Sequence, residues 1–550
     1  MTNQDTTFKE LVARAAAVDA QLTAPGAPFE LIEVEADGHR LKAYGKAQAS
    51  LAEFIQLGRG HGDDPFLSYR GDDWSFNRFY AAVDALAGRL QADLGIKPGD
   101  RVAIAMRNRP EWCVAFAAIA SVGAVPAPIN SFGLREELVA ALQQVDSKLV
   151  FLDAARRERI AADLPDLGMR DVLVDERPPA GGTSLDFRTL IAAAGPQRIL
   201  PKVNPDDPAL ILFTSGASGR AKAVLSSQLA VCQALYNIEY IGYSTALVSQ
   251  RAVAVVMQRG LRPTTLCAVP LFHVSGLHAQ FLDALRSGKR LVFMHRWDSR
   301  KAIDLIEAEH VTQFSGAPAM VMQLLKEPDF ARRCDTLVGL GFGGAGLPQS
   351  VIDDLHTRKP DSLSGIGFGM TESNGVGAAG SGELFFARPH SAGRLSPISQ
   401  TRVTAPDGKA LPQGEEGELW LRGVAVMTEY WRNPQATIQA LDPDGWLRTG
   451  DIGFVDTDGF LQVVDRIKDV INRSGEKIAA AEVESCLLQH PQVAEAAVFA
   501  LPDAKTGEAV AAVVVPVAGA RLESAAVRQF VTERLASYKV PRDVFVSDEP

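Results

Sequence analysis

The chain has 550 residues, of which 47% are hydrophobic and 22% charged, a composition typical of a globular protein with more than one hydrophobic core. The chain has 66 acidic and 56 basic residues, and the resulting net charge of −10 opposes binding to nucleic acid or to an anionic membrane. The start is polar and the longest apolar stretch contains glycine and proline, so we expect no signal peptide and no transmembrane segment. The five cysteines have no metal-binding spacing, which indicates reduced thiols in a cytoplasmic protein.

Helix-like and strand-like segments alternate in the first part of the chain. Ser75 is a suitable N-cap, and the hydrophobic residues behind it recur every three or four positions, which predicts a helix from Phe76. The segments that follow are a strand at 101–106, a helix opened by Pro110, a strand at 124–129, a helix at 134–144 and a strand at 149–152. This order predicts an α/β core built on a largely parallel sheet.

Turn sequences and short strands become frequent from about residue 400, which predicts a β subdomain over about 400–467. Beyond it, two strands near 494–501 and 509–517 and a helix over 523–535 predict a small α/β unit. We therefore predict an N-terminal domain of residues 1–467 and a C-terminal domain of residues 468–550.

A glycine-rich loop, Thr214-Ser215-Gly216-Ala217-Ser218-Gly219-Arg220-Ala221-Lys222, follows a predicted buried strand. Glycines let successive N–H groups turn toward one anion, hydroxyls add donors, and the lysine adds a mobile positive charge. The loop therefore has the chemistry of a phosphate site. It is not the loop of the common ATPases, because alanine and not glycine precedes the lysine. Taken alone, the loop fits a plain surface turn equally well.

Other motifs follow in order: Pro270-Leu-Phe-His273, Gly341-Phe-Gly-Gly-Ala345, Phe368-Gly-Met-Thr-Glu372, Thr449-Gly-Asp451 and Asp465-Arg-Ile-Lys-Asp469. Together with the loop they resemble the adenylate-forming superfamily of acyl-CoA synthetases, firefly luciferase and peptide-synthetase adenylation domains. The resemblance extends from about residue 64 to residue 550. It implies a large N-terminal domain of mainly parallel α/β subdomains plus a β subdomain, followed by a small mobile C-terminal domain.

The resemblance implies nucleotide contacts in Phe368-Gly369-Met370-Thr371-Glu372. The ring would lie against adenine, the threonine hydroxyl near the α-phosphate, and the glutamate on Mg²⁺. An aromatic face, a donor and a hard oxygen ligand suit these partners. The alternative is an ordinary strand end with a buried phenylalanine and an exposed glutamate.

Further nucleotide contacts are implied elsewhere. Asp451 would accept hydrogen bonds from the ribose hydroxyls, and Arg466 would reach the ribose from the domain junction. The backbone of Gly343, Gly344 and Ala345 would line the adenine and acid sites. The alternatives are surface ions and helix-capping glycines. The ATP phosphates would be held by the loop residues Thr214, Ser215, Gly216, Ser218 and Gly219.

His273 follows a strand-like run, where the family sets a histidine close to the substrate carboxylate. With it, the implied catalytic residues are Lys222, Thr371 and Glu372, whereas His278 is interpreted as a packing residue. Lys468 matches the hinge about which the C-terminal domain rotates between the two half-reactions.

Ser474 and Gly475 would line the tunnel for the pantetheine arm of coenzyme A. A plain turn is nearly as good an interpretation of Gly475.

The sequence departs from the family pattern in two places. Alanines stand at Ala217, Ala221 and Ala223, where the family has Thr, Pro and Gly. Family members also carry a late Gly-Lys motif whose lysine bridges the acid and the α-phosphate, and the sequence stops at Pro550 before it; Lys539 comes too early to replace it. We expect this omission to slow adenylation by about 10²–10³ without abolishing ATP binding.

The resulting hypothesis is an AMP-forming acid:CoA ligase that uses ATP, Mg²⁺ and coenzyme A. A fatty or aryl acid is favoured, because the expected pocket residues offer no cation for a second carboxylate; they are Tyr236, Tyr240, Tyr243, Ala317, Ala319, Met320 and Phe342. An amino-acid-activating domain is disfavoured because the segment ending at His273 lacks an aspartate for an α-ammonium group. A binding pseudoenzyme is the other alternative. The particular acid, the pathway and the oligomeric state are not predicted.

Overall fold

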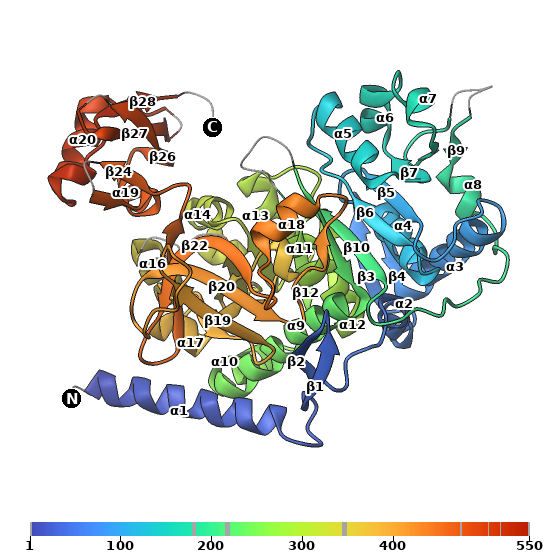
Figure 1. The fold of residues 1–550 in the computed structure, drawn as a ribbon, viewed down its shortest axis with the longest axis horizontal. Helices are drawn as coiled ribbons and strands as arrows, with labels where there is room; N and C mark the ends of the chain where they lie inside the picture. The colour runs from blue at the N-terminus through green and yellow to red at the C-terminus, as the bar shows by residue number, and fades with distance from the viewer. Residues whose placement is uncertain are drawn as a thin grey trace.

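The computed structural model describes residues 3–178, 183–214, 221–343, 349–473, 476–503, 505–517 and 519–547. It is a mixed α/β protein, in which a large N-terminal domain is followed by a small C-terminal domain (Figure 1). The predicted fold class is confirmed. No helix in these ranges combines the length and hydrophobicity needed to cross a membrane.

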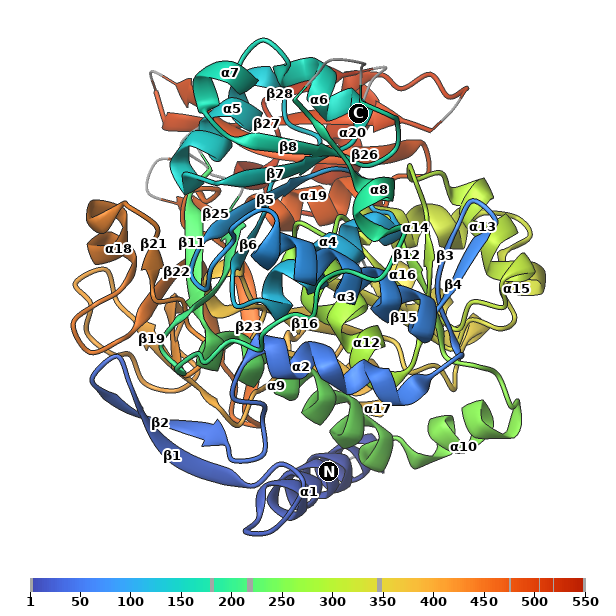
Figure 2. The ribbon, with the colours of Figure 1, turned by 90° about the vertical axis from the view of Figure 1, so that its right-hand side faces the viewer.

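A parallel sheet in the first part of the chain has the order β6 (Val125–Pro128), β5 (Arg101–Ala105), β7 (Leu149–Leu152), β8 (Arg170–Leu173), β9 (Leu185–Asp186). Helices α3 (Phe76–Ala92) and α4 (Pro110–Ser121) cover one face, and α5 (Arg135–Val145) covers the other (Figure 2). Ser75 caps α3 by accepting a hydrogen bond from the N–H of Arg78 (3.2 Å). The helix α4 is apolar on every side, and it is accordingly buried in the core. The predicted alternation of helices and strands is thus confirmed.

A second sheet joins thirteen strands within the described ranges. Its parallel part is β3 (Pro65–Tyr69), β13 (Arg290–Phe293), β12 (Thr264–Cys267), β14 (Gln313–Gly316), β15 (Gly339–Gly343) and β16 (Gly365–Phe368). Its antiparallel part is β4 (Asp72–Ser75), β17 (Ala378–Ser381), β18 (Gly393–Leu395), β19 (Ser399–Thr404), β20 (Gly417–Gly423), β22 (Leu447–Val455) and β23 (Phe460–Arg466). Because β18 pairs with β23, the β-rich region continues the parallel sheet without a break in hydrogen bonding.

A smaller sheet carries the two ends of the glycine-rich loop. The strands β10 (Pro208–Phe213) and β11 (Ala223–Ser227) form an antiparallel hairpin, and the loop connects them. The short strand β21 (Glu429–Tyr430) pairs with the other edge of β11. The described ends of the loop, Thr214 and Lys222, therefore lie next to paired strands.

The C-terminal sheet contains β24 (Ile471–Arg473), β25 (Glu476–Ile478), β26 (Val493–Asp503), β27 (Gly507–Pro516) and β28 (Asp543–Val546). It packs with α19 (Ala480–Leu488) and α20 (Ser524–Thr532) around its own core, which includes Val483, Val510 and Val527. This unit, red in Figure 1, lies at one side of the body and contacts it through Leu488. The domain boundary at residue 468 remains a prediction.

The other helices and strands lie outside the sheets described above. They are α1 (Asn3–Thr23), β1 (Leu31–Ala36), β2 (His39–Tyr44), α2 (Leu51–Gln56), α6 (Ala154–Ile160), α7 (Leu164–Leu167), α8 (Phe187–Ile191), α9 (Gln228–Val248), α10 (Gln250–Gln258), α11 (Val274–Gly276), α12 (Asp283–Ser287), α13 (Ser299–Ala308), α14 (Pro318–Lys326), α15 (Phe330–Arg333), α16 (Gln349–Arg358), α17 (Glu383–Ala387) and α18 (Pro434–Ala440).

Candidate functional site

A cavity of about 2150 Å³ lies beside the β10–β11 hairpin and extends from the carboxyl ends of β12, β14, β15 and β16 along these strands. Ligands of parallel α/β sheets bind at this edge because the connecting loops leave a crevice there. The predicted site residues that line the cavity are Thr214, Lys222, His273, Gly343, Phe368, Gly369, Met370, Thr371, Glu372, Arg466 and Lys468. The structure thus brings together residues that are up to 254 positions apart, from Thr214 to Lys468.

Several predicted residues lie outside the described part of the chain. They are Ser215, Gly216, Ser218, Gly219, Gly344, Ala345, Ser474 and Gly475.

Two hydrogen bonds join Thr214 and Lys222, the residues at the two ends of the loop. The N–H of Thr214 donates to the carbonyl of Lys222 (3.0 Å), and the N–H of Lys222 donates to the Thr214 hydroxyl (3.4 Å). The Lys222 ammonium lies 4.7 Å from the centroid of the Tyr430 ring, a cation–π contact. No carboxylate among the described residues pairs with Lys222, so its charge is available to an anion in the cavity.

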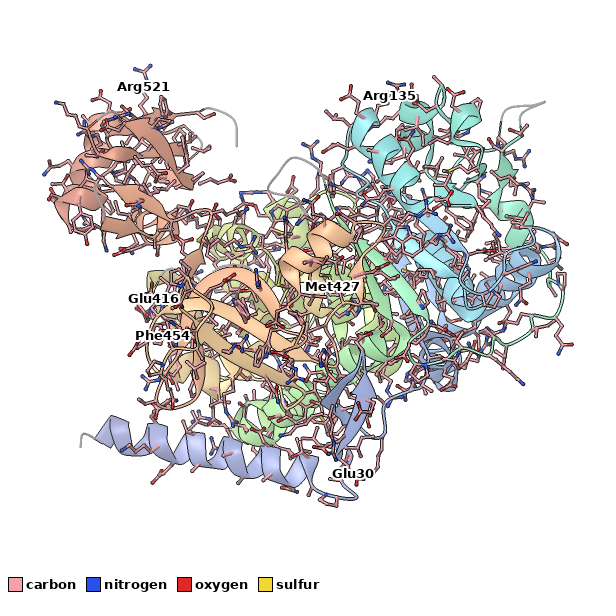
Figure 3. The ribbon with its side chains drawn as sticks, in the orientation of Figure 1. Glu30, Arg135, Glu416, Met427, Phe454 and Arg521 are labelled. Atoms are coloured by element: carbon pink, nitrogen blue, oxygen red, sulfur yellow. The ribbon has the colours of Figure 1, made fainter. Side chains whose placement is uncertain are left out.

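Glu372 lies in a short turn directly after β16, and its residue is only 6% exposed. Its Oε1 accepts a hydrogen bond from the Tyr430 hydroxyl (2.6 Å). Its backbone carbonyl accepts one from the N–H of Met427 (2.7 Å), which lies in the interior of the body (Figure 3). Burial, and then the neighbouring Glu372, raise the pKa of Tyr430, so the phenol stays protonated and remains a donor.

The chemistry of this carboxylate fits a magnesium ion that is shared with a nucleotide. Among the described residues, no hydrogen bond reaches Oε2 of Glu372, and no group of three His, Cys, Asp or Glu could hold a metal ion by itself. Mg²⁺ in nucleotide sites is commonly held by one or two carboxylates together with substrate phosphates and waters. Glu372 could therefore supply the protein ligand.

Asp451 and Arg466 lie opposite each other on β22 and β23. Arg466 Nε donates to Asp451 Oδ1 over 3.1 Å, and the Asp451 side chain is only 6% exposed. Burial raises the pKa of Asp451, while the charge of Arg466 opposes that shift. Arg466 lines the cavity but Asp451 does not, so the ribose contact of Asp451 stays a prediction.

His273 follows β12 and stands at the start of α11. Its half-buried ring lies 4.4 Å from the ring of Phe272, centroid to centroid. Burial lowers the pKa of His273, so the imidazole is neutral at neutral pH. A neutral ring can donate one hydrogen bond to a carboxylate in the cavity.

Sequence reasoning missed Tyr430, which contacts both Lys222 and Glu372. A lone tyrosine in a turn-rich segment carries no spacing signal. Its place follows from the pairing of β21 with β11, which sets Tyr430 opposite Val224.

The predicted acyl pocket is partly wrong. Tyr243, Ala317, Met320 and Phe342 line the cavity, as predicted, whereas Ala319 does not. Tyr236 and Tyr240 do not line it either, because both rings pack against Phe29 and Tyr44. The Tyr236 hydroxyl donates to the Pro28 carbonyl, and the Tyr240 hydroxyl donates to Asp19.

Three features are typical of a nucleotide-binding α/β protein. They are a phosphate-type loop that ends in a lysine without a carboxylate partner among the described residues, a buried carboxylate, and a crevice at the edge of a parallel sheet. The chain belongs to the family of AMP-binding enzymes. The model for AMP-binding enzymes matches residues 55–431, and the model for the AMP-binding enzyme C-terminal domain matches residues 482–550. The resemblance inferred from the motifs is therefore confirmed.

Individual relatives agree with this assignment. The chain is 32% identical over 512 residues to a Humulus lupulus protein named Probable CoA ligase CCL5, covering 90% of this chain and 89% of that protein. ATP-bound MatB from Rhodopseudomonas palustris is 27% identical, with a TM-score of 0.75 over 90% of this chain and 95% of that chain. Mycobacterium tuberculosis fatty acyl CoA synthetase is 28% identical, with a TM-score of 0.66 over 91% and 94%.

Proposed function

We propose that the protein is an ATP-dependent carboxylic acid:CoA ligase of the AMP-forming type that acts on a fatty or aryl acid. The observation that carries the proposal is the grouping of Lys222, His273 and Glu372 around one cavity, whose walls also include the apolar side chains of Met320 and Phe342. The names of the relatives, which include CoA ligases and an acyl-CoA synthetase, support it.

The reaction would proceed in two steps. A carboxylate oxygen attacks the α-phosphorus of ATP, the bond to the bridging oxygen breaks, and pyrophosphate leaves. The thiolate of coenzyme A then attacks the acyl carbon, and AMP leaves with the oxygen that joined it to the acid. Lys222 would stabilise negative charge on the phosphates, and His273 would orient the carboxylate. Mg²⁺ held by Glu372 would, when bound, disperse charge on the phosphate oxygens.

An acid with a single carboxylate suits the pocket. Lys289 lines the cavity, but its ammonium is paired with Asp283 over 2.6 Å, so it offers no free charge to a second carboxylate. Arg107 and Arg296 line the cavity next to the carboxyl ends of β5 and β13, at the edge where the phosphates would bind. All five cysteines are buried and unbridged, which supports the predicted cytoplasmic compartment.

The test is a panel of fatty, aryl and amino acids incubated with ATP, Mg²⁺ and coenzyme A. We expect acid-dependent pyrophosphate release and acyl-CoA formation with at least one fatty or aryl acid. Replacement Lys222→Met should lower the rate by about 10²–10³. Turnover of amino acids alone, or no acid-dependent release with any member of the panel, would overturn the proposal.

A further inference from the structure

Glycines form a floor along part of the cavity. Gly339, Gly341 and Gly343 alternate on β15, and Gly365 and Gly367 alternate on β16. Gly341 is in register with Gly365, and Gly343 with Gly367. Because alternate residues of a strand face the same side, these glycines share one face of the sheet, and all of them line the cavity.

The packing of the protein does not explain all of these glycines. A Cβ at Gly341 would lie 2.3 Å from Ser315 Oγ, and one at Gly365 would lie 2.3 Å from Ser381 Oγ, so glycine is needed there. At Gly339 the nearest atom would be 3.7 Å away, and at Gly367 it would be 3.9 Å away. Neither has a positive φ. A side chain would fit at both positions, and its absence leaves room for a ligand.

The glycine floor is elongated along β15. Gly343 lies at the carboxyl end of β15, next to the strand that leads into Glu372, and Gly339 lies at the opposite end. At the usual strand rise, the four steps between them span roughly 13 Å. An acyl group that starts at the reacting end can therefore lie extended on the backbone.

Two buried polar residues line the same cavity as this floor. His278 and Gln280 belong to a π-helical segment, Leu277–Leu282, and both line the cavity. Gln280 Nε2 donates to the backbone carbonyl of Ser315 (3.2 Å), and Ser315 is in register with Gly341. Single π-helical turns of this kind frequently mark functional sites.

Both side chains have buried polar atoms without a hydrogen-bond partner among the described residues. His278 is 1% exposed and Gln280 is 3% exposed. Three of their atoms have no hydrogen-bond partner among the described residues: the two ring nitrogens of His278 and Oε1 of Gln280. Burial lowers the pKa of His278 to about 4, so its ring is neutral at neutral pH and offers one donor and one acceptor. Buried polar groups nearly always have partners, and a ligand oxygen would provide one.

We propose that the acid activated by this protein is an elongated one, whose chain lies on the glycine floor and carries an uncharged hydroxyl or keto oxygen beside His278 and Gln280. This inference rests on the ligase function proposed above. A hydroxyl could donate to Gln280 Oε1 or exchange hydrogen bonds with the imidazole, and a keto oxygen could accept from its N–H. A second carboxylate would meet a neutral imidazole and an amide, which do not balance its charge.

The experiment measures kcat/KM for acyl-CoA formation with butyric acid, hexadecanoic acid and hexadecanoic acids that carry a mid-chain hydroxyl or keto group. The oxygenated acids should be preferred over the plain long acid by at least about tenfold. Replacement His278→Leu should remove this preference and leave butyric acid turnover unchanged. Replacement Gly339→Val should lower kcat/KM for every long acid by about tenfold or more and spare butyric acid, with Gly339→Ala intermediate. A single cooperative thermal unfolding transition identifies the variants that are folded.

The outcomes separate this inference from the ligase proposal. Turnover of butyric acid without any gain for oxygenated long acids, or a folded Gly339→Val variant that handles long acids normally, would overturn the inference and leave the ligase function intact. Failure of every acid of this panel and of every aryl acid to give acyl-CoA would overturn both.

Discussion

The hydroxyl of Tyr430 orients the carboxylate of Glu372 through one hydrogen bond of 2.6 Å. The same tyrosine ring lies under the ammonium of Lys222. One side chain therefore fixes the separation between a candidate metal ligand and a candidate phosphate-binding cation. This arrangement leaves the other oxygen of Glu372 for a metal ion, and it makes Tyr430 a positioning residue.

Replacement Glu372→Gln removes the charge that a metal ion requires but keeps the shape of the side chain. We expect adenylation to fall by about 10² or more, because a carboxylate oxygen is a far better ligand for Mg²⁺ than an amide. The thermal unfolding midpoint should change little. Metal-dependent pyrophosphate release at the normal rate would remove Glu372 from this role.

Replacement Tyr430→Phe keeps the ring under Lys222 and deletes the donor to Glu372. The Mg²⁺ concentration for half-maximal rate should rise by about tenfold, since losing a partner of a metal-bound carboxylate costs 10–100-fold in metal affinity. The KM for the acid should stay the same. A fall in stability with an unchanged Mg²⁺ dependence would show that the tyrosine is only structural.

His278 makes the stability of the fold depend on pH. Its imidazole takes up a proton near pH 6.5 when unfolded and only near pH 4 in the folded protein. Between these values the unfolded state binds more protons, so the free energy of unfolding falls as the pH falls, by up to about 3 kcal/mol from this group. Between pH 7 and pH 4 the free energy of unfolding, measured with denaturant, should therefore fall more for the protein than for His278→Leu. Parallel pH profiles would contradict this.

At the scale of elements, β18 holds two parts of the large sheet together, because it pairs with β17 on one side and β23 on the other. Gly393 begins this strand with φ +93°, and a Cβ there would lie 1.9 Å from the carbonyl carbon of Ala379. Glycine is therefore required. The strand β23 ends at Arg466, so this joint also positions one wall of the cavity.

Replacement Gly393→Ala should destabilise the protein by about 3 kcal/mol or more, since both the backbone conformation and the close contact resist a side chain. The matched control is Gly60→Ala, where nothing lies within 4 Å and φ is not positive; it should change stability by less than about 0.5 kcal/mol. Thermal unfolding midpoints measured at one heating rate compare the two. Equal midpoints would contradict this view of the joint.

Local patterns predicted the elements well and their pairing poorly. The strand Leu149–Leu152 was predicted with its observed ends, because a short apolar run between turn signals has few alternatives. The β10–β11 hairpin and the β18–β23 pairing were not predicted, since strand partners depend on contacts far apart in the chain. Tyr236 and Tyr240 were wrongly assigned to the pocket because the sequence does not tell which face of α9 meets which neighbour.

At the scale of the whole molecule, a short segment connects the body to the C-terminal sheet. Arg466, Ile467 and Lys468 line the cavity, and β24 begins three residues later. The N–H of Ile467 still donates to Gly450 (2.8 Å), whereas the N–H groups of Asp469 and Val470 both turn back to the Arg466 carbonyl. Lys468 therefore lies where the pairing of β23 has ended and a turn begins.

Replacement Lys468→Pro should slow the two half-reactions unequally, because proline fixes φ and restricts the residue before it. No backbone hydrogen bond of the described residues uses the N–H of Lys468, so the ring removes none. Lys468→Ala, which keeps the backbone free, should affect both steps alike. Single-turnover rates of pyrophosphate release and of thioester formation from supplied acyl-AMP measure the ratio. An equal slowing by proline would argue against a hinge.

The most direct test of the central claim follows oxygen atoms through the reaction. An accepted acid labelled with heavy oxygen in both carboxylate positions is turned over with ATP and coenzyme A, and the nucleotide product is examined by mass spectrometry. Attack by the carboxylate on the α-phosphorus predicts AMP that carries one heavy oxygen, with the other in the thioester. Unlabelled AMP, or ADP with labelled phosphate, would contradict the adenylate route.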